Sequence, residues 1–217
     1  MKPSYDFNHP IFKKVPRYRR LAREHLTLAE LKSDRVKWRV VKTETVLKIP
    51  VAYHIDYHVK SIVGIDQDNA PVYGNKHTVE ISFPQDFPKS TFAARTVSRI
   101  WHPNIKWDKP NKGHICTNNK KFGKGYTLYM LVLRIGEIIQ YKNYLAENVP
   151  PYPDDAMVAR WVQQYAEPQG LMGGRGKQPV DNSNLLEYTE PPEPERKLKI
   201  KRVVRSSSKP INLKRKP

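Results

Sequence analysis

The stretch Trp101-His-Pro-Asn-Ile-Lys-Trp-Asp-Lys-Pro-Asn-Lys-Gly-His-Ile-Cys116 holds the only cysteine among the 217 residues of the chain. A strand-like run, residues 96–100, precedes it, and Pro103 prevents simple continuation of that strand because proline has no backbone N–H to donate. The Asn, Asp, Pro and Gly residues that follow predict an extended, turn-rich loop. A thiol at the end of such a loop favours a nucleophile displayed on a rigid edge. The alternative, a small buried cysteine that packs as a hydrophobe, stays open on position alone.

The composition indicates one domain with extensions. Hydrophobic residues make up 38% of the chain, which is enough for one core but not for a core that uses every segment. Lys and Arg number 39 against 21 Asp and Glu, and residues 196–217 carry ten of the basic residues and no acidic one. A single cysteine excludes an internal disulfide framework and a zinc site built on several thiolates. Because no apolar run is long enough to span a membrane and residues 1–16 are no signal peptide, the sequence predicts a soluble cytoplasmic protein.

Hydrophobic periodicity predicts an α+β fold, with about four antiparallel strands in a meander, an N-terminal helix and C-terminal helices. Pro16 suits the first turn of the N-terminal helix. Helical spacing of apolar residues predicts two later helices, and Asp154 is the expected N-cap of the second. The strand signals cover residues 38–49, 53–63, 77–83 and 92–100, and the later helices cover residues 128–139 and 156–165.

Four motifs in the same order around the cysteine resemble the ubiquitin-conjugating enzymes, a family marked by His-Pro-Asn-Ile, a short loop and Gly-x-Ile-Cys. The resemblance covers residues 17–166, most of the chain. The matching segments are His102-Pro-Asn-Ile105 with Gly113-His-Ile-Cys116, Phe83-Pro-Gln-Asp-Phe-Pro88, Pro71-Val-Tyr-Gly74 and Pro151-Tyr-Pro-Asp-Asp-Ala156.

The resemblance implies a ubiquitin-conjugating-enzyme-like fold and an acyltransferase activity that needs no cofactor. Such an enzyme accepts a ubiquitin-like modifier from an activating enzyme as a thioester, here on Cys116, and passes it to an amine or a hydroxyl of a protein target. The expected domains are an N-terminal arm (1–16), a catalytic domain (17–166), and a Pro/Gly-rich linker with a basic tail (167–217).

The departures from the family pattern point to a divergent member, for example of a bacterial ubiquitin-like system. The loop between Asn104 and Cys116 is about four residues longer than is usual in the family, and Thr117 stands where Leu commonly follows the cysteine. Residues 89–92 read Lys-Ser-Thr-Phe where the family often has Phe-x-Pro-Pro after Pro88, and residues 123–126 read Gly-Lys-Gly-Tyr where Trp-Ser-Pro-Ala is expected. These two loops are the surface that the family usually presents to RING-type ligases. A standard RING partner is therefore not expected.

Three residues are the expected catalytic groups. Cys116 would carry the modifier as a thioester, because a thiolate is both a good nucleophile and a good leaving group. The Asn104 side-chain amide would donate to the negative oxygen that forms during transfer, or else would only hold the loop. By the resemblance, Asp155 lies near the thioester and would assist loss of the proton from the attacking lysine, with helix capping as the alternative role.

His102, Pro103 and His114 are the expected site-organising residues. For His102 the alternative is a general base, but the resemblance favours a histidine that holds the loop by hydrogen bonds. His114 is either an exposed loop residue or a charge that raises the thiolate fraction of Cys116. No metal site is expected: His54 and His58, on a strand, lie about 13 Å apart at roughly 3.3 Å per residue.

Two basic segments are candidate partner-binding surfaces. The helix that carries Arg17, Arg20 and Arg23 presents either an ordinary solvated face or a docking surface for an acidic partner. The basic tail would find an acidic partner or a nucleic acid by electrostatic attraction. The alternative function follows from that tail: a catalytically idle member of the fold that serves as a binding module or scaffold. The sequence names neither the modifier, the target nor the need for a ligase.

Overall fold

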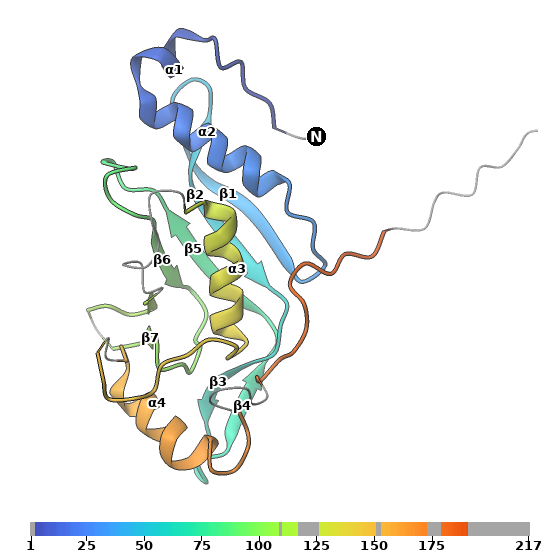
Figure 1. Ribbon diagram of the computed structural model, residues 1–217, viewed down its shortest axis with the longest axis vertical. Helices are drawn as coiled ribbons and strands as arrows, with labels where there is room; N and C mark the ends of the chain where they lie inside the picture. Colours follow the sequence, from blue (N-terminus) through green and yellow to red (C-terminus); the bar gives the residue numbers. More distant parts are fainter. Residues whose placement is uncertain (1–2, 109, 117–125, 151–152, 173–178, 191–217) are drawn as a thin grey trace, which may run out of the picture.

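In the computed structural model, which describes residues 3–108, 110–116, 126–150, 153–172 and 179–190, one antiparallel sheet forms the frame of the fold. Its strand order is β1-β2-β5-β6-β8-β7, and α3 (Leu128–Ile139) lies across one face (Figure 1). The α+β architecture is confirmed: β1, β2, β5 and β6 are the expected four strands, and two very short strands extend the sheet. The strands of the sheet are β1 (Val36–Glu44), β2 (Ile49–Tyr57), β5 (His77–Ser82), β6 (Ala93–Thr96), β7 (Ile105–Lys106) and β8 (His114–Ile115), while β3 (Ser61–Ile65) and β4 (Pro71–Gly74) form a separate hairpin.

The prediction of one strand over residues 53–63 is wrong, because β2 leaves the sheet at Tyr57. Tyr57 pairs with His77, the first residue of β5, so the ladder between the two strands ends there. The chain then turns, and β3 begins in the separate hairpin. Alternation continues beyond Tyr57 because Val59 is also buried, at 2% exposure. The alternation of apolar residues over 53–63 therefore indicates which side chains are buried, and it does not indicate where the backbone pairs in the sheet.

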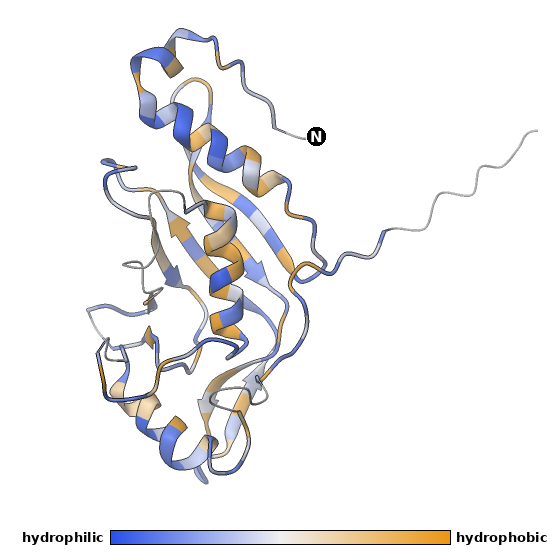
Figure 2. Cartoon of the chain, viewed as in Figure 1, coloured by the Kyte–Doolittle hydropathy of each residue, from blue (hydrophilic) through white to orange (hydrophobic). Residues whose placement is uncertain are grey.

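Helix α3 is held on the sheet by its apolar face. Figure 2 shows apolar residues along α3 and along the strands behind it. The Tyr57 hydroxyl donates to the Val132 carbonyl at 2.8 Å, so a buried polar atom of the sheet is satisfied by the helix. No helix in the described part of the chain is both long and apolar enough to cross a membrane. The helices are α1 (Pro10–Lys14), α2 (Pro16–Ala29), α3 (Leu128–Ile139) and α4 (Ala156–Trp161), and α4 continues as the π-helical turn η2 (Val162–Ala166).

A second, smaller hydrophobic cluster supports the loop that begins at Trp101. It joins that loop to α4, η2 and the segment after α3. The Tyr141 hydroxyl donates to the Trp101 carbonyl within this cluster. The loop is thus fixed from below by buried side chains, which are Ile62, Trp101, Tyr141, Ala146, Val158, Ala159, Trp161, Val162, Ala166 and Met172.

The packed structure continues past residue 166, where the sequence predicted the linker to begin. Residues 180–189, the C-terminal strap, run back along the sheet and α3 (Figure 1). Leu185 is only 5% exposed, and the Ser33 hydroxyl donates to its carbonyl. Gly136 makes room for it, because a Cβ there would lie 2.5 Å from Leu185 Cδ1. Leu185 therefore seats this mostly polar strap in the main core.

Candidate active site

Backbone hydrogen bonds bring together the three residues that the sequence analysis placed in catalysis. The Cys116 N–H donates to the Asn104 carbonyl at 2.9 Å. The Asp155 N–H donates to the Pro103 carbonyl, also at 2.9 Å. The two carbonyls belong to consecutive residues, so the Pro103–Asn104 unit lies between the cysteine and the carboxylate. A main-chain contact thus joins Pro103 to Asp155 across about fifty positions of the sequence, independently of side-chain rotamers.

Cys116 stands at the end of a short strand with its side chain partly exposed. It follows β8, in which Ile115 pairs with Ile105 of β7. Both isoleucines are buried, at 3% and 0% exposure. Because successive side chains of a strand point to opposite faces, the buried Ile115 directs the next side chain away from the core. The thiol is therefore displayed on a fixed edge, as expected for an accessible nucleophile.

Asn104 fixes the loop through both ends of its side-chain amide. Oδ1 accepts from the Leu145 N–H at 2.8 Å, and Nδ2 lies 3.5 Å from the Leu145 carbonyl, at the long limit for a hydrogen bond. The residue is 8% exposed. Since the amide nitrogen carries two hydrogens, at least one is left for another acceptor. The geometry therefore fits both roles considered for Asn104, holding the loop and donating to a reacting oxygen.

His102 is buried within the loop and is bound to its backbone. It is 0% exposed, and its Nδ1 accepts from the Asn104 N–H at 3.0 Å. Burial lowers its pKa to about 3, so the imidazole is neutral near pH 7. The ring lies 4.4 Å from that of Tyr141. A buried ring whose Nδ1 is occupied by the backbone is a poor candidate for a general base.

Asp155, and not Asp154, caps α4. The Asp155 carboxylate accepts from the Val158 N–H at 3.0 Å, and Asp155 is 7% exposed. The expectation that Asp154 is the N-cap is wrong because the cap side chain reaches the N–H three residues on, and Val158 occupies that position for Asp155. Asp154 instead lies 3.2 Å from His114 Nδ1, a partly exposed pair. That pair links the strand before Cys116 to the turn before α4, and no local sequence signal indicates it.

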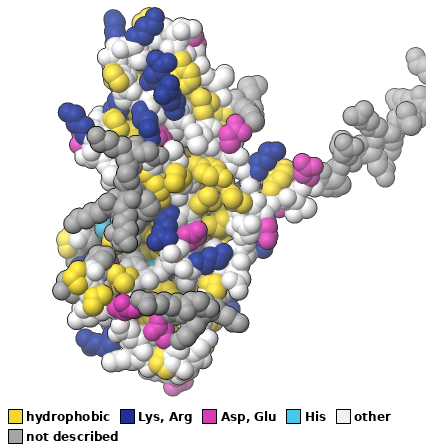
Figure 3. All heavy atoms as spheres, in the orientation of Figure 1, with side chains coloured by type: hydrophobic (Ala, Val, Ile, Leu, Met, Phe, Trp, Pro, Cys, Tyr) yellow, Lys and Arg dark blue, Asp and Glu magenta, His cyan; other side chains and the backbone are white. Residues whose placement is uncertain are grey.

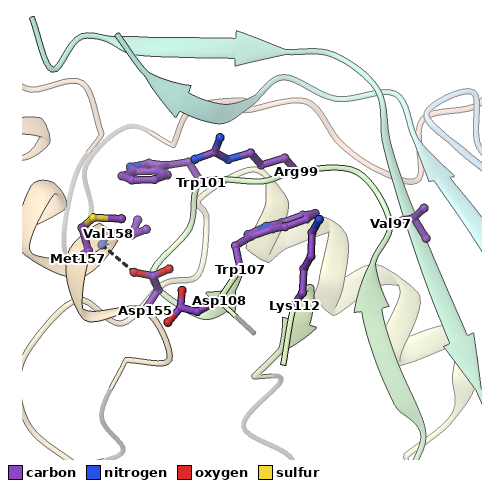
Figure 4. Close-up of a pocket in the computed structure, with 9 residues that line it drawn as sticks. All are labelled: Val97, Arg99, Trp101, Trp107, Asp108, Lys112, Asp155, Met157 and Val158. Carbon is purple, nitrogen blue, oxygen red and sulfur yellow. Dashed lines mark hydrogen bonds between the residues drawn. The ribbon is translucent and has the colours of Figure 1, made fainter. Parts of the chain in front are cut away.

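A pocket of about 490 Å³ opens beside Asp155 (Figure 4). Two tryptophans line it, and Trp107 and Lys112 belong to the loop between Asn104 and Cys116, which the sequence analysis expected to be longer than usual. The sequence analysis noted that extra length but assigned no role to it. An aromatic residue in a loop insertion next to the cysteine was the available signal. The lining residues are Val97, Arg99, Trp101, Trp107, Asp108, Lys112, Asp155, Met157 and Val158.

Two curated sequence relatives are ubiquitin-conjugating enzymes. The chain is 30% identical to ubiquitin-conjugating enzyme E2 K of Homo sapiens over 101 residues. These residues make up 46% of each of the two proteins. Over 93 residues it is 32% identical to ubiquitin-conjugating enzyme E2-22 kDa of Drosophila melanogaster, which is 42% of either protein. This chain is similar to ubiquitin-conjugating enzymes over that part of its length. It spans somewhat less than half the length of these curated relatives. No family model matches the chain.

Solved structures of conjugating enzymes resemble the fold only distantly. A Toxoplasma gondii ubiquitin-conjugating enzyme E2 domain aligns with 68% of this chain and 87% of its own length, at 21% identity and a TM-score of 0.45. A structure described as a novel ubiquitin-conjugating enzyme covers 68% of this chain and 86% of its own, at 18% identity and a TM-score of 0.47. Both TM-scores are below 0.5, so these structures carry no argument about the function of this chain.

The three arginines proposed as a docking surface have different surroundings. Lys and Arg side chains gather over α1 and α2 (Figure 3). Arg17 is bound by Glu44 at 2.5 Å and Arg20 by Glu24 at 2.6 Å, so both guanidinium groups are already engaged within the chain. Arg23 is exposed. Of the three, Arg23 is the one whose charge points into solvent.

Some expectations concern residues outside the described part of the chain. These are Thr117, most of the segment 123–126, and the basic tail 196–217. Within the described residues, no group of three or more His, Cys, Asp or Glu side chains is arranged to hold a metal ion.

Proposed function

We propose that this protein accepts a ubiquitin-like modifier from an activating enzyme as a thioester on Cys116 and transfers it to an amine or a hydroxyl of a protein target. The observation that supports this best is the main-chain frame around the Pro103–Asn104 unit. It holds a displayed thiol, a side-chain amide with donor capacity and a carboxylate at one place.

The proposed reaction has two acyl transfers. In the first, the Cys116 thiolate attacks the carbonyl carbon of the modifier's thioester on the activating enzyme, and the thiolate of that enzyme leaves. In the second, the acceptor nitrogen or oxygen attacks the new thioester, Cys116 leaves as thiolate, and the acceptor loses a proton. No oxidant, reductant or cofactor is needed, because both steps exchange one acyl bond for another.

Asn104 and Asp155 would act in the second transfer. The Asn104 amide would donate its remaining hydrogen to the oxyanion of the tetrahedral intermediate. The Asp155 carboxylate uses one oxygen to cap α4 and lines the pocket, so it would accept a hydrogen bond from the acceptor ammonium and assist loss of its proton, which leaves the neutral amine that attacks. His102 and Pro103 would hold the frame, and His114 would tie it to the turn before α4 through Asp154.

The remaining partners and the location follow from the same proposal. The exposed basic residues of α1 and α2, Arg23 among them, would contact an acidic surface of a pathway protein, and the tail would add a second electrostatic contact with an acidic partner or a nucleic acid. We place the protein in the cytoplasm, since a thioester carrier needs a reduced thiol.

The test is adduct formation with candidate modifiers and their activating enzymes. Non-reducing gels should show an adduct that a thiol reductant removes. Cys116→Ser should give a reductant-resistant ester or no adduct, because no other thiol exists in the chain. A reductant-sensitive adduct in the Cys116→Ser variant would refute the proposal. A protein that folds but forms no adduct with any modifier pair would support the idle binding module instead.

A further inference from the structure

The pocket beside Asp155 carries opposite charges at its two ends. In Figure 4 the carboxylates of Asp108 and Asp155 lie at one end and Lys112 lies at the other, with the Trp107 ring between them. Arg99 lies beside Trp101, away from the two carboxylates. A site that is neutral in sum but divided in this way favours an occupant with charges of both signs over a single ion.

The two cations are held over aromatic rings and have no acidic partner among the described residues. The Arg99 guanidinium lies 5.6 Å from the centre of the Trp101 ring, and the Lys112 ammonium lies 5.3 Å from that of Trp107. Neither makes an ion pair with any described residue. Cation–π contacts orient the side chains without neutralising them. Each cation is therefore ready to bind a carboxylate from outside.

The rim of the pocket is apolar and exposed. Val97 is 55% exposed and Met157 is 63% exposed, on opposite sides of the opening. Water-exposed apolar side chains around a polar interior suit contact with a polypeptide segment. A small anion such as phosphate would leave both uncovered.

We propose that this pocket recognises a target segment in which an acidic residue lies a few positions from the acceptor lysine. This inference rests on the proposed function and names its substrate class. The ammonium of the acceptor lysine would approach Asp155, while the acidic side chain would bind Arg99 and Lys112. Trp107, Asp108 and Lys112 come from the lengthened loop, so this preference would be a property that the insertion confers.

Direct binding tests the proposal without any thioester. A ¹H–¹⁵N spectrum of the uncharged protein shows the indole N–H signals of four tryptophans, of which Trp101 and Trp107 line the pocket. Trp38 packs against His25 and Tyr53 in the main core, which makes it an internal control. The probes are nine-residue peptides with a central lysine and one glutamate, placed in turn one to four positions away on either side, and the same peptides with glutamine.

We expect the Trp101 and Trp107 signals to shift with the glutamate peptides and the Trp38 signal to stay. The best glutamate peptide should bind about fivefold more tightly than its glutamine version, since an exposed ion pair is worth at most a factor of roughly five. The difference should shrink as salt is raised. Equal binding of all glutamate and glutamine peptides would overturn the proposal. Equal shifts with inorganic phosphate or free glutamate would also overturn it, because they indicate a general anion site.

Charge reversal supplies the matched control. The double variant Arg99→Glu with Lys112→Glu should lose the preference for glutamate and prefer peptides in which that residue is arginine. Arg160→Glu makes the same kind of charge change on an exposed residue of α4 outside the pocket and should keep the original preference. An equal loss in Arg160→Glu would show a long-range charge effect and refute the pocket. Because the peptides bind uncharged protein, failure of adduct formation on Cys116 would leave this result intact, and the two failures are distinguishable.

Discussion

Replacing Asn104 by alanine separates the two roles that its side chain can have. The substitution removes the Oδ1 acceptor of the Leu145 N–H and the Nδ2 donor at the same time. If Asn104 only holds the loop, the variant loses stability, and transfer falls only as far as the loop moves. If it also donates to the oxyanion, transfer falls much further than loading of Cys116.

The two effects have different magnitudes. Loss of one good hydrogen bond, with a partner left unpaired in a mostly buried setting, costs about 2 kcal/mol. For a domain of this size that lowers the melting temperature by roughly 4–8 °C. One oxyanion-hole donor is worth roughly 3 kcal/mol of transition-state stabilisation, on the order of a hundredfold in rate. We therefore expect Asn104→Ala to load Cys116 at close to the normal rate and to discharge to lysine about a hundredfold more slowly.

The assay is a single-turnover discharge of preloaded protein to free lysine, alongside thermal unfolding. Leu185→Ala is the matched control, because truncating this buried leucine of the strap costs about 2–4 kcal/mol far along the chain from the loop. It should unfold earlier than the wild type and still discharge normally. If Leu185→Ala slows discharge as much as Asn104→Ala, or if Asn104→Ala discharges within about threefold of the wild type, the oxyanion role is refuted.

Three further perturbations follow from the same structure. Asp155→Asn keeps an oxygen for the Val158 N–H, so the melting temperature should not change while discharge slows by about tenfold or more. The slowing should be smaller at higher pH, where more of the acceptor amine is already deprotonated. Unchanged discharge kinetics would leave helix capping as the only role of Asp155. His102 has a pKa of about 3 in the folded chain and roughly 6.5 in the unfolded chain, so the unfolded chain binds the proton first as pH falls. The neutral buried ring therefore contributes its full stability above about pH 6.5, and this contribution is lost as pH falls toward 3. Urea unfolding at pH 7 and pH 5 should therefore show a loss about 2 kcal/mol smaller in His102→Gln than in the wild type, and equal losses would contradict the buried neutral ring. Truncation after Glu195 removes ten basic residues but keeps the strap, so the melting temperature and the loading of Cys116 should be unchanged. Binding to an acidic partner or a nucleic acid should weaken in a salt-dependent way. Unfolding on truncation would show that the tail is packed structure.

The sequence predicted most of the fold because its strongest signals are local. The apolar period of α3 and the proline at the start of α2 each depend on residues within one or two turns. The motifs around Cys116 placed the cysteine, the asparagine and Asp155 in one site, although the frame that joins them is made of backbone atoms. The error at Tyr57 has a local cause too, since burial of Val59 extends a pattern beyond the end of the sheet.

Contacts between distant segments could not be predicted in the same way. The Asp154–His114 pair depends on the Pro103–Asp155 backbone bond, which no residue pattern encodes. The strap depends on the lack of a side chain at Gly136, which makes space for a leucine nearly fifty positions later. In both cases the contact depends on the distance in space between two segments, and neither segment carries a sequence signal that predicts the contact.

The lengthened loop can build a pocket wall without disturbing the cysteine because its return is fixed at Gly113. The backbone φ there is +85°, and a Cβ would lie 2.3 Å from the Thr96 carbonyl oxygen, so only glycine fits. The Gly113 carbonyl accepts from the Thr96 N–H at 2.7 Å, and its own N–H donates to the Lys106 carbonyl at 2.6 Å. These bonds tie the end of the loop to β6 and β7 just before Cys116. The extra residues are thereby confined to the far side of the loop, where their side chains line the pocket beside Asp155, and the frame that displays the thiol stays as the shared motifs specify.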